Sequence, residues 1–236
     1  MRIYFIRHGD PDYANDTLTD RGWKEAEALS ERVAKWDVDR FYCSPLGRAR
    51  DTASLSLKLM KRTAETKDWL REFYVPVIDQ ETGQERIPWD LMPSYWTNQP
   101  ILYDKDNWLD HALMKTGKVS EEYSRVCDGI DEILEEYGYK RKGGYYITEQ
   151  GSEKTIAIFC HLGVQFVMLS HLFGISAPAL WQNFFVAPTS VTEVVTEERI
   201  KGEVCFRCKR LGDISHLYID GIEPSDSGFF NEVYDK

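Results

Sequence analysis

This chain of 236 residues contains no apolar run close to the roughly 18 residues that a membrane-spanning helix needs, so no membrane association is expected. Its five cysteines are few, odd in number and scattered, which argues against a disulfide framework and favours a reducing cytoplasm. A strand-like run begins at residue 2, and a signal peptide is therefore not expected. Basic residues are also scarce: 29 Lys and Arg face 39 Asp and Glu, and the net charge of −10 argues against nucleic acid as a partner.

The first 60 residues alternate between strand-like and helix-like patterns. The apolar run 2–7 predicts a central strand, and residues 39–42 predict a second strand. Helical spacing follows each of them, after the N-cap candidate Thr19 and after Ser44. This alternation predicts an α/β fold, a three-layer sandwich with a mostly parallel central sheet and helices on both faces.

An irregular stretch interrupts this pattern. Residues 75–118 are rich in proline and aromatic side chains and show no period, so they are predicted to form an inserted cap, packed by its own aromatics, within one domain spanning 1–236. The polar tail from Pro224 is expected to be poorly ordered. Further elements are expected as a helix over 120–137, a strand over 155–160, a helix after 161, and late, antiparallel strands over 192–196 and 204–210.

The triplet Arg7-His8-Gly9 comes at the end of the first predicted strand. In open α/β sheets ligands bind at the carboxyl ends of strands. A neutral His8 imidazole there can attack phosphorus and form a phosphohistidine, while the planar fork of Arg7 matches phosphate oxygens. The simpler alternative is a loop histidine beside a surface cation.

Three more side chains follow predicted strands or connectors in the same way. Arg48 stands at a strand-to-helix junction, where free N–H groups favour anions. His161 follows the strand 155–160 and can donate to phosphoryl oxygens, and the carboxyl of Glu72 can act as a general acid. Taken singly, each has an ordinary reading as a solvated or packed side chain. Their placement at one sheet edge predicts phosphoryl chemistry.

Together these segments resemble the histidine phosphatase superfamily, the phosphoglycerate mutase-like group. The matching segments, in the order typical of the family, are Arg7-His8-Gly9, residues 18–26, residues 44–52, Leu70-Arg71-Glu72 and Cys160-His161-Leu162-Gly163. The resemblance implies that His8 is the phosphorylated nucleophile, that Arg7, Arg48 and His161 form the phosphate pocket, and that Glu72 is the proton donor and then the base. It also implies that no metal or other cofactor is needed, because cationic side chains balance the charge of the transition state.

Some positions depart from the family pattern. Asp10 stands where many members have Thr, Glu or Gln, so it remains a second candidate for the proton donor. The polar residue that often follows in this loop is matched by Asn15, a candidate substrate-binding residue, with shifted spacing. Leu162 replaces the first glycine of the frequent His-Gly-Gly. The segment 75–118 does not resemble the part that mutases use to retain a bisphosphate.

The resulting hypothesis is a metal-independent phosphomonoester hydrolase of the cytoplasm that acts on a small phosphorylated metabolite. Two alternatives stay open: a phosphoglycerate mutase, and a non-catalytic protein that binds a phosphorylated ligand. Tyr95 and Trp96 are the candidates in the cap for contact with the substrate, and an aromatic cap favours a nucleoside, sugar or aromatic monophosphate. The pair Cys205 and Cys208 is weak evidence for a metal, because a second pair is missing from the sequence.

Overall fold

The computed structural model describes residues 1–79 and 82–230, and its largest sheet there has eight strands in the order β5-β4-β10-β1-β11-β12-β9-β8. In that order the strands are Ala64–Thr66, Arg40–Cys43, Thr155–Cys160, Arg2–Arg7, Val191–Ile200, Glu203–Asp213, Tyr145–Ile147 and Lys140–Lys142. The half from β5 to β1 is parallel, whereas β11 and the strands beyond it pair antiparallel. The predicted α/β class is confirmed, and the late strands form the antiparallel half.

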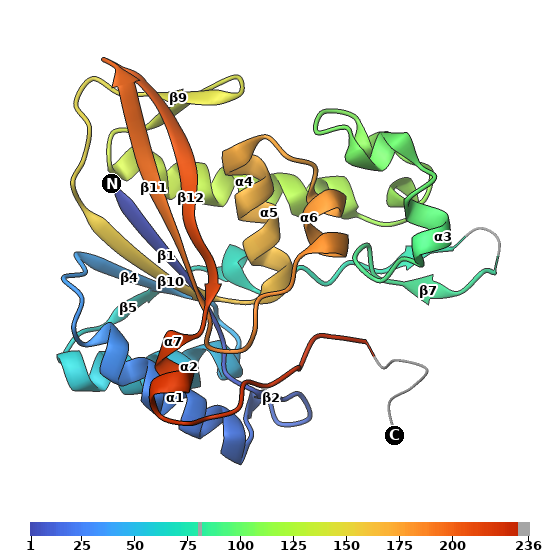
Figure 1. Ribbon diagram of the computed structural model, residues 1–236. Coiled ribbons are helices and arrows are strands. Elements are labelled where there is room, and N and C mark those ends of the chain that lie inside the picture. Colours follow the sequence, from blue (N-terminus) through green and yellow to red (C-terminus); the bar gives the residue numbers. More distant parts are fainter. Residues whose placement is uncertain (80–81, 231–236) are drawn as a thin grey trace.

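Helices cover both faces of this sheet, with α1 and α2 on one side and α4 and α5 on the other (Figure 1). The alternation of side chains along β1 explains the two layers: Ile3 and Phe5 pack in the core cluster that includes α4 and α5, whereas Ile6 packs in the cluster with α1 and α2. The helices are α1 Asp20–Val33, α2 Gly47–Met60, α3 Pro93–Trp96, α4 Val119–Glu136, α5 Leu162–Phe173, α6 Ala177–Asn183 and α7 Ser215–Ile219.

The starts of α1 and α2 show how local sequence sets an element's first residue. The hydroxyl of Thr19 accepts a hydrogen bond from the backbone N–H of Gly22, so Thr19 caps α1 as its sequence predicts. Helix α2 begins at Gly47, three residues after Ser44, and its N-cap residue Leu46 makes no side-chain cap hydrogen bond. The backbone N–H of Gly47 is instead bound by the carboxylate of Asp16, from a distant loop.

The segment 75–118 is built from short elements. These are the hairpin β6 Val77–Ile78 and β7 Glu85–Arg86, helix α3, and the 3₁₀ turns η2 Pro100–Tyr103, η3 Trp108–Asp110 and η4 Met114–Thr116. Within the segment Trp96 packs on Tyr103, but Trp108 packs on Tyr123 of α4 and Trp181 of α6. The expectation that the segment is packed by its own aromatics is therefore only partly met, because its core continues into the main core cluster.

The C-terminal tail is tied to the body of the protein through residue 230, contrary to the expectation of poor order from Pro224. Ser225 is buried, and its backbone N–H donates to the carboxylate of Glu25 in α1. The ring of Phe229 stacks on that of Phe185, with 3.8 Å between centroids. Residues 231–236, to which the same expectation applied, lie outside the described residues.

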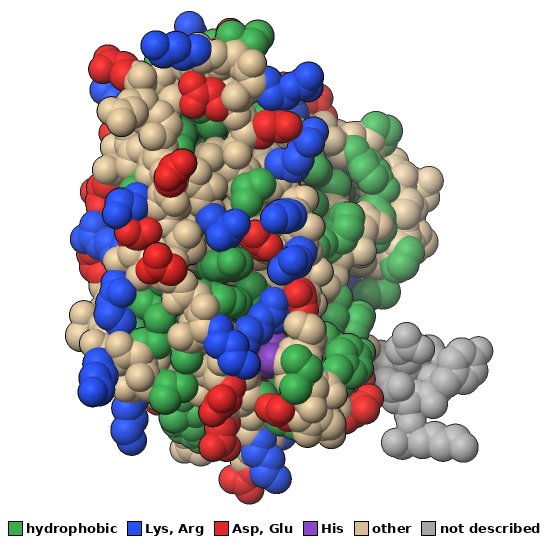
Figure 2. All heavy atoms as spheres, turned by 60° about the vertical axis from the view of Figure 1, so that its left-hand side comes forward, with side chains coloured by type: hydrophobic (Ala, Val, Ile, Leu, Met, Phe, Trp, Pro, Cys, Tyr) green, Lys and Arg blue, Asp and Glu red, His purple; other side chains and the backbone are tan. Residues whose placement is uncertain are grey.

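The surface carries both signs of charge. On the face shown in Figure 2, Lys and Arg side chains are interspersed with Asp and Glu side chains. Within residues 1–79 and 82–230, none of the helices combines the length and apolar character that crossing a membrane requires.

Candidate active site

His8 and His161 are neighbours because β1 and β10 are parallel and in register. Arg7, the last residue of β1, pairs with Cys160, the last residue of β10, so the residue after each strand lies at the same sheet edge. The backbone N–H of His8 donates to the carbonyl of Cys160 over 3.0 Å. The two imidazole rings lie 5.0 Å apart at 55°, and both are buried. The predicted meeting of strand-end histidines is therefore present.

The tautomer of His8 follows from its hydrogen bond. Its Nδ1 lies 2.7 Å from the carbonyl oxygen of Gly9. A carbonyl only accepts, so Nδ1 carries the proton and Nε2 keeps a free lone pair. Burial lowers the pKa of His8 well below 6.5, and the cations Arg7 and Arg48 lower it further. The imidazole is therefore neutral near pH 7, which is the state a nitrogen nucleophile needs.

His161 is held by Ser44, which follows β4. The Oγ of Ser44 accepts the N–H of Leu46 over 3.2 Å and lies 2.7 Å from Nε2 of His161. Because Oγ has a proton and a second lone pair, this contact fits either neutral tautomer of His161. The Nδ1 of His161 is buried and has no partner among the described residues. Burial, followed by the proximity of His8, lowers the pKa of His161 well below 6.5.

Arg7 is buried, and its guanidinium is spread between two backbone carbonyls. Nη1 donates to Val186 over 2.7 Å, and Nη2 donates to Ser227 over 2.6 Å. The guanidinium carbon lies 5.5 Å from the centre of the Phe185 ring. Its Nε is buried without a partner among the described residues. Arg7 is thus a fixed cation whose Nε has no acceptor among the described residues.

Arg48 is the second residue of α2, and an acidic partner orients it. Its Nη1 donates to Oδ1 of Asp16 over 2.7 Å, while Oδ2 of Asp16 accepts the N–H of Gly47 over 2.6 Å. The Nε of Arg48, like that of Arg7, is buried with no partner in the described part of the chain. Asn15, the neighbour of Asp16, is exposed and donates its amide to Asp12. A role for Asn15 in substrate binding stays a prediction.

Glu72 lies against the first turn of α5, the helix that begins directly after His161. Its Oε1 accepts the backbone N–H groups of Phe73 and Val164, over 2.7 and 3.0 Å, and Oε2 accepts that of Gly163 over 3.3 Å. A helix N-terminus attracts a carboxylate in this way. A Cβ on Gly163 would come within 2.8 Å of Oε1, so glycine at this position lets the carboxylate approach. The second donor candidate, Asp10, is engaged by the hydroxyls of Thr19 and Ser225.

Comparison with known protein families shows to which family the chain belongs. Residues 3–207 match the model of the histidine phosphatase superfamily, branch 1. The chain belongs to this superfamily. The resemblance drawn from the motifs is confirmed, and the match supports a phosphatase.

Individual relatives of this histidine phosphatase are distant. The chain is 24% identical to a probable phosphatase of Schizosaccharomyces pombe over 92% of this chain and 95% of that protein. It is 26% identical to the adenosylcobalamin/alpha-ribazole phosphatase of Escherichia coli over 77% and 83% of the two chains. Solved structures share its fold: mycobacterial glucosyl-3-phosphoglycerate phosphatase matches with a TM-score of 0.60 at 17% identity, covering 89% of this chain and 98% of that one. Phosphoserine phosphatase of Entamoeba histolytica matches with a TM-score of 0.58 at 17% identity, covering 92% of this chain and 98% of that one.

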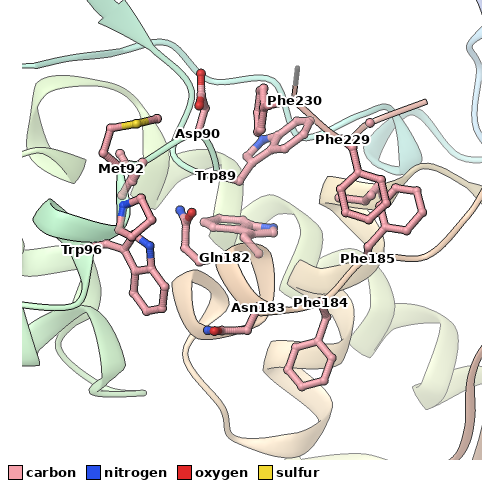
Figure 3. A pocket seen from close by; sticks show the side chains of 15 residues that line it. Trp89, Asp90, Met92, Trp96, Gln182, Asn183, Phe184, Phe185, Phe229 and Phe230 are labelled. Atoms are coloured by element: carbon pink, nitrogen blue, oxygen red, sulfur yellow. The ribbon is translucent and has the colours of Figure 1, made fainter. Parts of the chain in front are cut away.

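An aromatic pocket lies beside the strand-end histidines of this phosphatase. It measures about 360 Å³ and is formed by the segment 89–96, by the end of α6 with the residues after it, and by the tail at 228–230. Figure 3 shows Trp96 at one end of the pocket and the stacked rings of Phe185 and Phe229 at the other. Of the two cap residues predicted to face substrate, Trp96 lines this pocket, whereas Tyr95 packs edge-on against His111.

Three contacts of the site were missed by sequence reasoning. Ser44 lies inside a recognised motif, and its position directly after a strand is a signal that could have identified it as a partner of His161. Asp16 lies in a turn-rich loop, and Ser227 lies in the polar tail, more than 200 residues from Arg7. Neither of these two has a local pattern that points to the site. Cys205 and Cys208 lie on β12, where Cys205 contacts Glu197 and Cys208 contacts the carbonyl of Arg210.

Proposed function

We propose that this chain is a phosphomonoester hydrolase that works without a metal, through a phosphohistidine on His8, and acts on a small phosphorylated metabolite. One observation carries the proposal. Two buried N–H groups, on Arg7 Nε and Arg48 Nε, and the buried Nδ1 of His161 have no partner among the described residues, and they surround a histidine with a free Nε2. Buried donors normally find acceptors. A phosphoryl group supplies three oxygens as acceptors and phosphorus as the electrophile.

The first half of the proposed reaction forms the phosphohistidine. Nε2 of His8 attacks phosphorus in line, the new P–N bond forms, and the P–O bond to the leaving group breaks. Glu72, in its protonated form, gives its proton to the departing oxygen, so that an alcohol leaves and not an alkoxide. Arg7 and Arg48 balance the negative charge on the phosphoryl oxygens, the part that a divalent cation plays in many phosphoryl transfers.

The second half returns the enzyme to its starting state. The Glu72 carboxylate takes a proton from water, the water oxygen attacks phosphorus, and the P–N bond breaks. Inorganic phosphate leaves, His8 is again neutral, and Glu72 is again protonated. His161 and the two arginines hold the same three oxygens throughout, so the charge balance does not have to be rebuilt between the steps.

The proposed setting is the cytoplasm, which the scattered cysteines favour, and the proposed partner is a small phosphomonoester. The mutase alternative needs a pocket that retains a second anion next to the phosphoryl site. The residues that line the aromatic pocket include Asp90 as an acidic side chain and contain no Lys or Arg in the described part of the chain. This lining favours hydrolysis.

The test is phosphate release from a panel of phosphomonoesters in the presence of a metal chelator, with the His8→Ala variant alongside. We expect release by the wild type, and a loss of about four orders of magnitude or more in the variant, because the nucleophile is gone. A quenched reaction should contain a phosphorylated protein whose label is lost in acid and kept in base. Release that continues in His8→Ala, with unchanged thermal unfolding, would contradict the assignment of the nucleophile. A wild type that binds phosphate but hydrolyses no ester would favour a binding protein.

A further inference from the structure

The aromatic pocket joins the phosphoryl site directly. Leu162, which lines the pocket, follows His161 in the chain. Phe185, which also lines it, lies beneath the guanidinium of Arg7 at 5.5 Å. A Cβ on Gly228, a third lining residue, would come within 2.8 Å of Nη2 of Arg7. A phosphoryl group bound at Arg7 and His161 therefore places its ester substituent at the mouth of this pocket.

The chemistry of the pocket is aromatic and uncharged with one acidic exception. Seven of its fifteen lining residues are Trp or Phe, and Trp96, Phe185 and Phe229 come from separate parts of the chain. Asp90 is the charged side chain, and Gln182 adds an amide. Ring faces stack on planar groups, whereas a second anion would meet Asp90 with no cation to balance it. The lining therefore suits a neutral, planar group that carries a hydrogen-bond donor.

The C-terminal tail supplies one wall of this pocket. The carbonyl of Ser227 accepts from Arg7, and the next residue, Gly228, has φ of +105°, a conformation that glycine adopts readily. The turn there carries Phe229 onto the ring of Phe185, where the centroids are 3.8 Å apart. The wall is thus anchored to the same arginine that is proposed to bind phosphate.

We propose that this pocket is the leaving-group site and that it selects phosphomonoesters of a neutral, planar ring system over those of small aliphatic or anionic alcohols. Trp96 and Phe229, at its two ends, are the specificity-determining residues (Figure 3). This inference rests on the proposed hydrolysis, because it assigns the part of the substrate that lies beyond the phosphoryl group.

The experiment compares kcat/KM for benzyl phosphate, propyl phosphate and 3-phosphoglycerate in the wild type, Trp96→Ala, Phe229→Ala and Tyr218→Ala. Benzyl and propyl phosphate both release a primary alcohol of similar basicity, so their ratio reports on the pocket and not on the bond that breaks. Tyr218 is an exposed aromatic residue of α7 outside the pocket, and its variant is the matched control.

We expect the wild type to prefer benzyl over propyl phosphate by about tenfold or more, which is the range that apolar pockets reach. Trp96→Ala and Phe229→Ala should bring this ratio toward one, because benzyl phosphate loses its ring contacts in both variants. Tyr218→Ala should keep the wild-type ratio. Phe229 stacks on Phe185, which lies beneath Arg7, so Phe229→Ala can also disturb the phosphoryl site. Trp96→Ala therefore serves as the independent test of the pocket.

The outcomes separate the two proposals. Equal turnover of benzyl and propyl phosphate by the wild type would overturn the leaving-group site while leaving the hydrolase intact. A preference for 3-phosphoglycerate would do the same and would point to an anion-binding pocket. A ratio that survives both pocket substitutions would also overturn it. No turnover of any ester would instead count against the proposed function.

Discussion

The strand-end cluster and the aromatic pocket beside it differ in how the chain brings their residues together. His8, Ser44 and His161 stand directly after β1, β4 and β10, so the hydrogen-bonded register of three parallel strands places them. Trp96 ends the short helix α3, Phe185 and Phe229 lie outside the helices and strands, and the three line one pocket through side-chain packing. The first region depends on backbone pairing that cannot shift without moving the sheet, whereas the second depends on contacts that sequence changes alter one at a time.

Burial separates the strand-end cluster from the wall of the pocket that the C-terminal tail supplies. His8 and His161 are 2% and 0% exposed, whereas Phe229 and Phe230 are 59% and 53% exposed. Buried polar groups gain strength from the low local dielectric and are costly to disturb. Exposed loop aromatics tolerate change. The comparison teaches that the phosphoryl chemistry and the choice of substrate occupy parts of the protein with different freedom to vary.

Among variants that keep the nucleophile, the largest effect on activity is expected at Glu72, which contacts the first turn of α5. Glu72→Gln keeps the shape but removes the acid, and we expect kcat/KM for propyl phosphate to fall about 10³-fold. 4-Nitrophenyl phosphate, whose leaving group needs no proton, should lose far less. The measurement is the ratio of the two rates in each variant.

Asp10→Asn is the matched variant for this test. Its carboxyl is bound by the hydroxyls of Thr19 and Ser225, and we expect both esters to lose rate equally in this variant. If the selective loss of the propyl ester appears in Asp10→Asn and not in Glu72→Gln, the role of proton donor belongs to Asp10.

The next prediction concerns stability and the residues that contact the backbone of His8. The backbone N–H of Thr189 donates to the carbonyl of His8, and the Thr189 hydroxyl lies 3.2 Å from Nε2 of His216. Burial and then Arg32 lower the pKa of His216 to about 4. Between pH 6.5 and 4 the unfolded chain therefore holds a proton that the folded chain does not. The free energy of unfolding should fall by up to about 3 kcal/mol as pH drops through this window.

Urea unfolding at pH 7 and at pH 4.5 measures this loss. His216→Gln removes the titrating group, so the difference between the two pH values should shrink in the variant. His8 and His161, whose pKa values are also lowered by burial, leave part of the acid sensitivity in place. An unchanged pH dependence in His216→Gln would show that His216 does not titrate in this range.

The smallest expected effect on activity comes from a change in the strand-end cluster that leaves the aromatic pocket intact. Ser44→Ala removes the hydroxyl that is hydrogen-bonded to Nε2 of His161, and we expect kcat/KM to fall about tenfold for benzyl and propyl phosphate alike. The ratio between the two esters should stay at the wild-type value. Nitrogen-15 NMR of His161 should show a single tautomer in the wild type and a mixture of tautomers in the variant. A wild-type spectrum in Ser44→Ala would remove Ser44 as a positioning residue.

Much of the strand-end cluster was predictable from local sequence. The apolar runs that became β1 and β10, and the polar residue after each, are visible in the chain, and parallel strands end at one sheet edge. Helix α1 begins after Thr19 as its cap pattern predicts. Only part of the aromatic pocket was predictable. Trp96 was selected by its residue type, but no periodic pattern around Phe185 and Phe229 indicates that they lie in the same pocket.

By itself, the sequence determined the α/β class, the superfamily and the candidate site residues Arg7, His8, Arg48 and His161, because apolar periodicity and short motifs are local properties of the chain. The tertiary structure alone decided that Ser44 contacts His161, that Asp16 orients Arg48, and that the tail packs on Arg7. These contacts join residues 32 to 220 positions apart. The partners in these contacts are set by how the chain packs in three dimensions, and no local sequence pattern predicts that packing.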